Sequence, residues 1–78
     1  MRNSTVTFEI KKHIGVITEF PTGWKKEVNI VSWNDSEPKL DIRDWDPEHK
    51  HMSRGITLHK DEAEILSKLL LKEFEDGK

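Results

Sequence analysis

Hydrophobic and polar residues alternate along most of the chain, and only the last quarter changes to a helical spacing. Residues 6–19 place hydrophobic or β-branched side chains at every second position, at Phe8, Ile10, Ile14, Val16 and Thr18. A period of two residues is typical of a β-strand. Gly15 interrupts this segment, so we expect a long strand with a bend at residues 13–15.

Three further strands are predicted, each bounded by residues that favour turns. A Pro-Thr-Gly turn at 21–23 precedes a second strand at 24–33, and the Asn-Asp-Ser-Glu-Pro segment at 34–38 has turn chemistry throughout. A third strand follows at 39–45. A loop opens at residues 46–49, and residues 55–58 form a short closing strand.

The C-terminal segment, residues 60–75, predicts a helix. His59 takes the cap position, carboxylates fill the first turns and Gly77 marks the end. The hydrophobic positions are Ala63, Ile65, Leu66, Leu69, Leu70, Leu71 and Phe74. This stripe is wider than one contact with a sheet requires. We expect part of it to cover the sheet and part to meet a second copy of the chain; the alternative is a helix fully buried on its own sheet.

The fold class indicated is α+β, an antiparallel sheet followed by one C-terminal helix. The 78 residues suffice for a single domain, with residues 1–5 expected to be a flexible N-terminus. A domain of this size buries only about 60% of the surface that its unfolded chain exposes. Because the chain has no cysteine for disulfides, dimerisation is the usual remaining means of stabilisation.

The two faces of the second and third strands have different compositions. Successive side chains point to opposite sides of a sheet, so Val28 and Ile30 pair with Leu40 and Ile42 on a face expected to lie beneath the helix. The opposite face, expected to meet solvent, carries Lys25, Asn29, Trp33, Lys39, Arg43 and Trp45. Exposed aromatic side chains among cations mark a binding surface more often than they mark nothing.

Tryptophans interleaved with cations suit single-stranded nucleic acid. Every unpaired base offers a face for stacking, and Lys or Arg side chains meet the phosphates between the bases. Asp41 lies on the face of Arg43 and is expected to orient its guanidinium. The alternative is that Trp33 and Trp45 belong to the core or to a dimer interface, which a single bulge in a strand would bring about.

Charge and composition limit the remaining functions. The net charge of −2 argues against general affinity for nucleic acid, but residues 1–58 balance nine acids with nine bases and the excess of acid lies in residues 59–78. No hydrophobic run is long enough to span a membrane, and residues 1–7 lack the pattern of a signal peptide. We therefore expect a cytoplasmic, nucleoid-associated protein.

No catalytic or cofactor-binding constellation is recognisable. His49 and His51 with Asp46 and Glu48 lack a known ligand spacing, so a solvated loop is the preferred interpretation over a metal site. The sequence also lacks a glycine-rich phosphate loop and a serine with histidine at predictable reach. We expect no enzyme activity, no cofactor and no metal.

An ordered set of residues resembles a known family. The third strand reads Lys-Leu-Asp-Ile-Arg-Asp-Trp at 39–45, and it is followed by Asp46-Pro-Glu, Met52 and Arg54-Gly-Ile-Thr-Leu58. This set resembles the C-terminal domain of the eukaryotic transcriptional positive cofactor four family (PC4-like). Residues 23–34 look like its short bacterial YdbC-like branch. The resemblance spans roughly residues 8–75.

The resemblance implies a curved four-stranded antiparallel sheet, a homodimer formed mainly through the helices, and channels for single-stranded DNA. Trp33, Arg43, Trp45 and Arg54 match or lie near positions of the family's motifs. Two departures matter. The turn at 34–38 is acidic where eukaryotic members have a basic one. The 78 residues contain no serine- and lysine-rich regulatory tail, so coactivator activity is not expected to carry over.

The sequence thus predicts a non-catalytic homodimer that binds single-stranded DNA with little sequence preference. Trp33 and Trp45 are expected to stack on bases, and the full set of binding residues is Lys25, Asn29, Trp33, Lys39, Arg43, Trp45 and Arg54. Single-stranded RNA is open as a ligand of the same surface. The rival hypothesis is a protein–protein adaptor that docks a partner on the aromatic face, since Trp and Arg also anchor protein interfaces.

Overall fold

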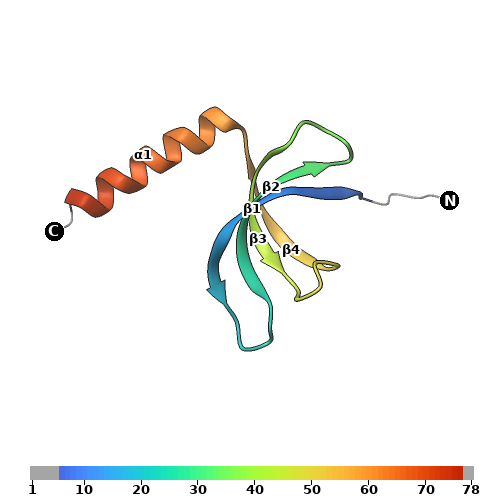
Figure 1. Cartoon of the computed structure of the whole chain (residues 1–78). Coiled ribbons are helices and arrows are strands. Elements are labelled where there is room, and N and C mark those ends of the chain that lie inside the picture. The colour runs from blue at the N-terminus through green and yellow to red at the C-terminus, as the bar shows by residue number, and fades with distance from the viewer. Residues whose placement is uncertain (1–5, 77–78) are drawn as a thin grey trace.

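Four strands form one antiparallel sheet in the order β1-β2-β3-β4 in the computed structural model, which describes residues 6–76 (Figure 1). The elements are β1 (Phe8–Glu19), β2 (Lys25–Trp33), β3 (Lys39–Trp45), β4 (Met52–Leu58) and the helix α1 (Lys60–Asp76). The predicted fold class, the sheet and the C-terminal helix are confirmed. The expectation of a flexible segment at residues 1–5 lies outside the described residues.

The first strand is bent by three irregularities in its pairing with β2. The register shifts between Ile10 and Lys12, between His13 and Gly15, and between Val16 and Thr18. The predicted bend at 13–15 is confirmed, but the regular alternation expected for the strand is wrong. Each bulge places an extra residue in one strand and increases the local bend and twist.

A tight turn follows β2 and reverses the chain toward β3. Asn34 and Asp35 both have positive φ, 51° and 62°, and the Ser36 amide donates to the Trp33 carbonyl at 2.8 Å. Two left-handed central residues are typical of a type I′ turn, whose twist matches that of a hairpin. Pairing of β2 with β3 runs without interruption from Val31 and Lys39 to Lys25 and Trp45, one residue out of the register that this turn alone would give.

The sheet has two faces of different character. The aromatic face carries Lys25, Glu27, Asn29, Val31, Trp33, Lys39, Asp41, Arg43 and Trp45, together with Phe8 of β1 and Thr57 of β4. The aliphatic face carries Val28, Ile30, Leu40, Ile42, Ile56 and Leu58. This division, predicted for β2 and β3, is confirmed by the pairs Val28–Ile42 and Ile30–Leu40, and β4 continues it with Ile56 opposite Ile42.

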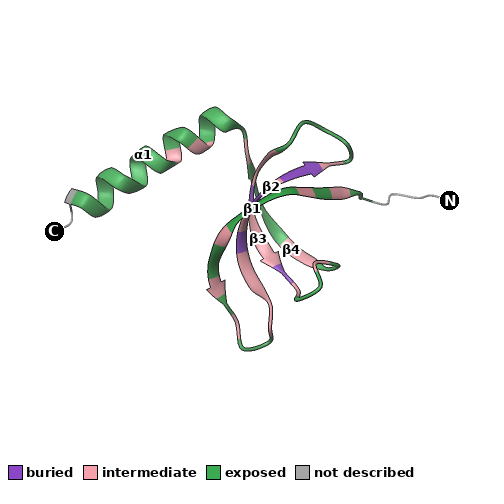
Figure 2. Ribbon diagram, in the orientation of Figure 1, coloured by how far each residue is buried: buried purple, intermediate pink, exposed green. Residues whose placement is uncertain are grey.

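The aromatic face, rather than the aliphatic one, holds the core. Val31, Trp45, Asn29 and Asp41 have no exposed surface, so the predicted solvent exposure of Asn29 and Trp45 is wrong. The rings of Phe8 and Trp45 lie 5.0 Å apart although β2 separates their strands. The sheet therefore curls around this face and buries its centre, which Figure 2 shows as purple segments in β2 and β3.

The helix begins as predicted but does not cover the sheet. The His59 amide donates to Glu62 Oε1 at 2.8 Å and the His59 carbonyl accepts from the Ala63 amide, which caps the first turn. Beyond that turn α1 leads away from the strands (Figure 1), and Leu69 and Phe74 are 60% and 71% exposed. The expected packing of the helix over Val28 and Ile30 is therefore wrong within one chain.

Gly55 allows β4 to approach β3 at Arg43. A Cβ at this position would collide with the Arg43 Cβ and the Ile42 carbonyl, whereas a Cβ at Gly15 would meet no atom within 4 Å. Gly55→Ala is expected to lower the free energy of unfolding by about 1–3 kcal/mol, the usual cost of overpacking. Urea denaturation followed by circular dichroism measures the loss.

Gly15→Ala is the matched control for this substitution. With open space around the added methyl group, it should leave stability unchanged or raise it by about 0.4–1 kcal/mol through the unfolded state. Equal losses in the two variants would contradict the role given to Gly55.

Candidate functional site

Trp33 and Arg43 form a stacked pair on the aromatic face. The Arg43 guanidinium lies over the Trp33 ring, with Cζ 4.6 Å from the ring centroid. Trp33 comes from the last position of β2 and Arg43 from the centre of β3. A planar cation over an indole is attracted by the negative face of the ring, so each side chain limits the freedom of the other.

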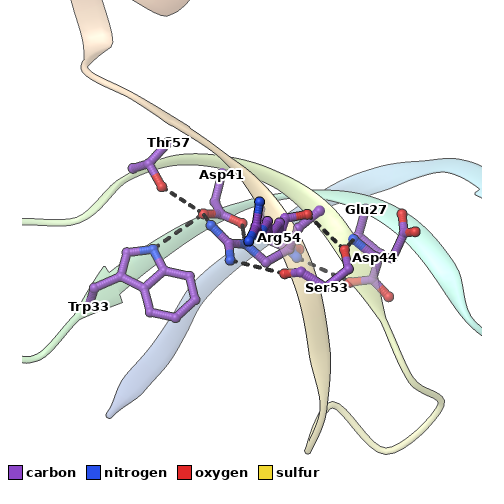
Figure 3. Close-up of polar contacts among 9 residues, drawn as sticks. Glu27, Trp33, Asp41, Asp44, Ser53, Arg54 and Thr57 are labelled. Atoms are coloured by element: carbon purple, nitrogen blue, oxygen red, sulfur yellow. Dashed lines mark hydrogen bonds and ion pairs between the residues drawn. The ribbon is translucent and has the colours of Figure 1, made fainter. Parts of the chain in front are cut away.

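A single buried carboxylate holds this pair in place. Asp41 accepts hydrogen bonds from Arg43 Nε at 2.6 Å and Arg43 Nη2 at 2.8 Å, and from Trp33 Nε1 at 3.2 Å and Thr57 Oγ1 at 3.0 Å. Figure 3 shows Trp33 and Thr57 converging on it from two sides. The expectation that Asp41 orients Arg43 is confirmed. Three of these hydrogen bonds reach Oδ2 and one reaches Oδ1, and the charge of the carboxylate is neutralised by Arg43.

An aromatic cluster supports Trp33 from beneath. Trp45 stacks with Trp33 at 6.5 Å and 11°, and Phe8 contacts both indoles at 5.8 and 5.0 Å. His49 packs against the other side of Trp45 at 5.5 Å. Trp45 is fully buried, so its ring offers no face to a ligand. The alternative that placed it in the core is correct for its burial, but Trp45 lies on the predicted face and the pairing of β2 with β3 contains no bulge.

A second polar network lies on the same face. The Glu27 carboxylate, 3% exposed, contacts His49 Nε2 at 3.0 and 2.9 Å and accepts from Asn29 Nδ2 at 3.1 Å. Asn29 Oδ1 contacts His13 Nδ1 at 2.7 Å. The predicted binding residue Asn29 therefore has its amide engaged inside the protein.

The loop after β3 is held by Asp46. Its carboxylate accepts from the amides of Lys50 and His51 and contacts His51 Nδ1 at 3.0 Å. The hydrogen bond with the His51 side chain is the main cause that lowers the pKa of Asp46 to about 2. His49 adopts a positive φ of 59° in this loop. The carboxylate thus fixes the conformation that carries His49 to Glu27 and Trp45.

Three predicted cations lie at the borders of the site. Lys25 pairs loosely with the exposed Glu19 at 3.5 Å, and Lys39 reaches only the Glu37 carbonyl, also at 3.5 Å. Arg54 is exposed in the stretch of β4 where pairing with β3 slips. Within residues 6–76 the Arg54 side chain has no ion-pair partner. Weak exposed pairs of this kind leave a cation available to an anionic ligand.

A pocket of about 550 Å³ opens beside the stacked pair. It is lined by Val6, Trp33, Asn34, Arg43, Met52 and Thr57. Met52, one of the residues that carry the family resemblance, therefore lies beside the site. Sequence reasoning missed Phe8, Asn34 and Thr57. The predicted closing strand contained Thr57, but the sequence did not place it opposite Asp41, because the pairing of β3 with β4 slips between Arg43 and Trp45.

Two classes of site find no support in the part of the chain that the structure describes. No three His, Asp or Glu side chains are grouped so that they could hold a metal ion. Over the same residues, no helix has the length and hydrophobicity needed to cross a membrane. The loop histidines instead contact Glu27 and Asp46.

The sequence of this chain matches a known protein family and a bacterial relative. A family model described as Transcriptional Coactivator p15 (PC4) matches residues 20–69, a segment that contains β2, β3, β4 and the first half of α1. An uncharacterized protein of Treponema pallidum (strain Nichols) is 34% identical over 68 residues, which cover 87% of this chain and 80% of that protein.

The role of Asp41 can be tested by Asp41→Asn. The asparagine side chain has the same shape, but it lacks the negative charge that balances Arg43. One of the two oxygens that accept hydrogen bonds is also replaced by an NH2 group, which would face the donors of Arg43, Trp33 and Thr57. Breaking a buried pair in this way costs about 3–5 kcal/mol, so the urea midpoint should fall sharply. Asp44→Asn is the control, because the Asp44–Lys26 pair is partly exposed and worth about 0–1 kcal/mol. A similar loss in both variants would show that Asp41 has no special role.

Proposed function

The chain belongs to the Transcriptional Coactivator p15 (PC4) family, and on that premise we propose that it is a non-catalytic protein that binds single-stranded DNA with little sequence preference. The family suggests single-stranded DNA binding and a role related to transcription. A cytoplasmic, nucleoid-associated location and work in transcription, replication or repair are part of the proposal.

The observation that carries the proposal is the stacked pair of Trp33 and Arg43 beside an open pocket. An unpaired base stacks on an aromatic or guanidinium plane at a gain of about 1–3 kcal/mol, whatever its identity. Duplex DNA hides the faces of its bases, so this surface favours single strands. Single-stranded RNA presents the same faces and phosphates and is a second ligand class for the site.

The roles of the predicted binding residues are assigned by their accessibility. Trp33 and Arg43 contact a base, while Trp45 and Asn29 act from beneath as supports and do not touch the ligand. Phosphate contacts come from the cations at the borders, Lys25, Lys39 and Arg54. This arrangement places stacking at the centre of the site and charge around it.

A homodimer formed through α1 is the second part of the proposal. Ile65, Leu69, Leu70, Leu71 and Phe74 are all exposed on a helix that leaves the sheet. On the sheet, Ile56 of the aliphatic face is 51% exposed. A small domain with this much exposed hydrophobic surface is stabilised by burying it against a second copy.

DNA binding is tested by tryptophan fluorescence during titration with oligo-thymidine of about 20 nucleotides. Quenching should saturate with single strands, weaken with salt and be much smaller with matched duplex. If Lys25, Lys39 and Arg54 each neutralise one phosphate, the log–log salt slope should lie near −2, from about −0.7 per phosphate. Trp33→Ala should weaken binding by about 1–3 kcal/mol.

Trp24→Ala is the matched control, because Trp24 lines a separate pocket with Phe20 and Asp44. It should retain wild-type affinity. No quenching by either form of DNA would contradict the proposal and favour the adaptor hypothesis, in which the aromatic face docks a protein.

The dimer is tested by sedimentation equilibrium. The wild-type protein should have twice the mass of one chain, and Leu69→Asp should shift it to the monomer by placing a charge in the hydrophobic interface. Ser67→Asp adds the same charge at a polar exposed position of α1 and should stay dimeric. A monomeric wild-type protein would remove this part of the proposal.

A further inference from the structure

The pocket beside Trp33 presents hydrogen-bond donors to a ligand and has no free carboxylate. Its volume of about 550 Å³ lies in the range of small-ligand sites. Val6 and Met52 supply hydrophobic walls, and polar groups come from Arg43, Asn34 and Thr57. Whether these groups donate or accept hydrogen bonds determines which edge of a base the pocket can bind.

The carboxylate and amide oxygens around the pocket are already used inside the protein. Asp41 is fully buried and accepts from Arg43, Trp33 and the Thr57 hydroxyl, so its oxygens are not offered to a ligand. Asn34 Oδ1 accepts from the Thr7 amide at 2.9 Å. Because that amide can only donate, the contact also fixes which end of the Asn34 side chain is the nitrogen.

The donors are not all used. A guanidinium has five N–H groups, and three of those on Arg43 are engaged, two by Asp41 and one by the Ser53 carbonyl at 3.3 Å. Two remain without a partner among residues 6–76. Over the same residues Asn34 Nδ2 makes no hydrogen bond, so two side chains on the pocket wall present unpaired donors.

We propose that this pocket selects bases that carry a carbonyl oxygen at the edge, thymine and guanine, over cytosine and adenine. Thymine O4 and guanine O6 accept from the donors of Arg43 and Asn34. Cytosine N4 and adenine N6 are amino groups that would face those donors without a partner. The inference rests on the proposed function, since it concerns which bases that site takes, and it gives a preference for composition without reading a defined sequence.

Oligomers of deoxyuridine and deoxycytidine isolate this edge. Both are pyrimidines without a methyl group, and they differ in the oxygen or amino group at position 4 and the nitrogen beside it. Twenty-nucleotide strands titrated at pH 8 and fixed salt should show about fivefold tighter binding of deoxyuridine, the value of one net hydrogen bond. Equal affinities, or tighter binding of deoxycytidine, would overturn the inference while leaving DNA binding intact. Failure of both strands to bind would instead remove the proposed function.

Asn34→Asp tests the donor directly. Aspartate tolerates the left-handed conformation and keeps an acceptor for the Thr7 amide, but replaces the donor with a second acceptor. The preference for deoxyuridine should disappear or reverse. Ser36→Asp adds the same charge at an exposed position of the same turn, outside the pocket, and should weaken both strands equally with the preference retained. An unchanged preference in Asn34→Asp would exclude Asn34 from base selection.

Discussion

The buried carboxylate of Asp41 connects the parts of the site. Its four hydrogen bonds come from the end of β2, from β3 itself and from β4. They turn the Trp33 ring across the sheet and hold Arg43 over it, which a hydrophobic residue in the same place would not do. Gly55 belongs to the same arrangement, because only a residue without a Cβ lets β4 lie beside Arg43. The Asp-Ile-Arg and Gly-Ile-Thr segments are therefore linked by one interaction.

Much of this could be predicted from the sequence because strands repeat every two residues. The period places Asp41 and Arg43 on one face, and the turn residues after Trp33 predict the hairpin that brings β2 alongside them. The two-faced character of β2 and β3, the helix and its cap at His59 follow from local patterns. These features depend on neighbours in the chain or on an adjacent strand, which periodicity describes well.

The burial of Trp45 depends instead on the curvature of the sheet. Three register shifts in β1 bend the strand, so Phe8 reaches Trp45 across β2 and the aromatic face closes on itself. The alternation of hydrophobic and polar residues does not predict how many bulges a strand contains. A flat sheet with this sequence would expose both Trp33 and Trp45. The direction of α1 likewise depends on tertiary contacts and not on a local pattern. Its hydrophobic stripe shows that the helix must be covered, but the stripe does not distinguish its own sheet from a second copy of the chain.

Curvature also explains how a chain with a net charge of −2 can offer a surface to an anion. The acids of the aromatic face are paired internally, Asp41 with Arg43 and Glu27 with His49. The helix carries most of the remaining excess of acid, and it leads away from the strands (Figure 1). Exposed charges separated by more than about 8 Å are largely screened at physiological salt. The potential that a strand of nucleic acid meets is therefore set by the cations at the borders of the curled face. Net charge is a poor guide to binding in a fold that engages the acids of one face in internal contacts.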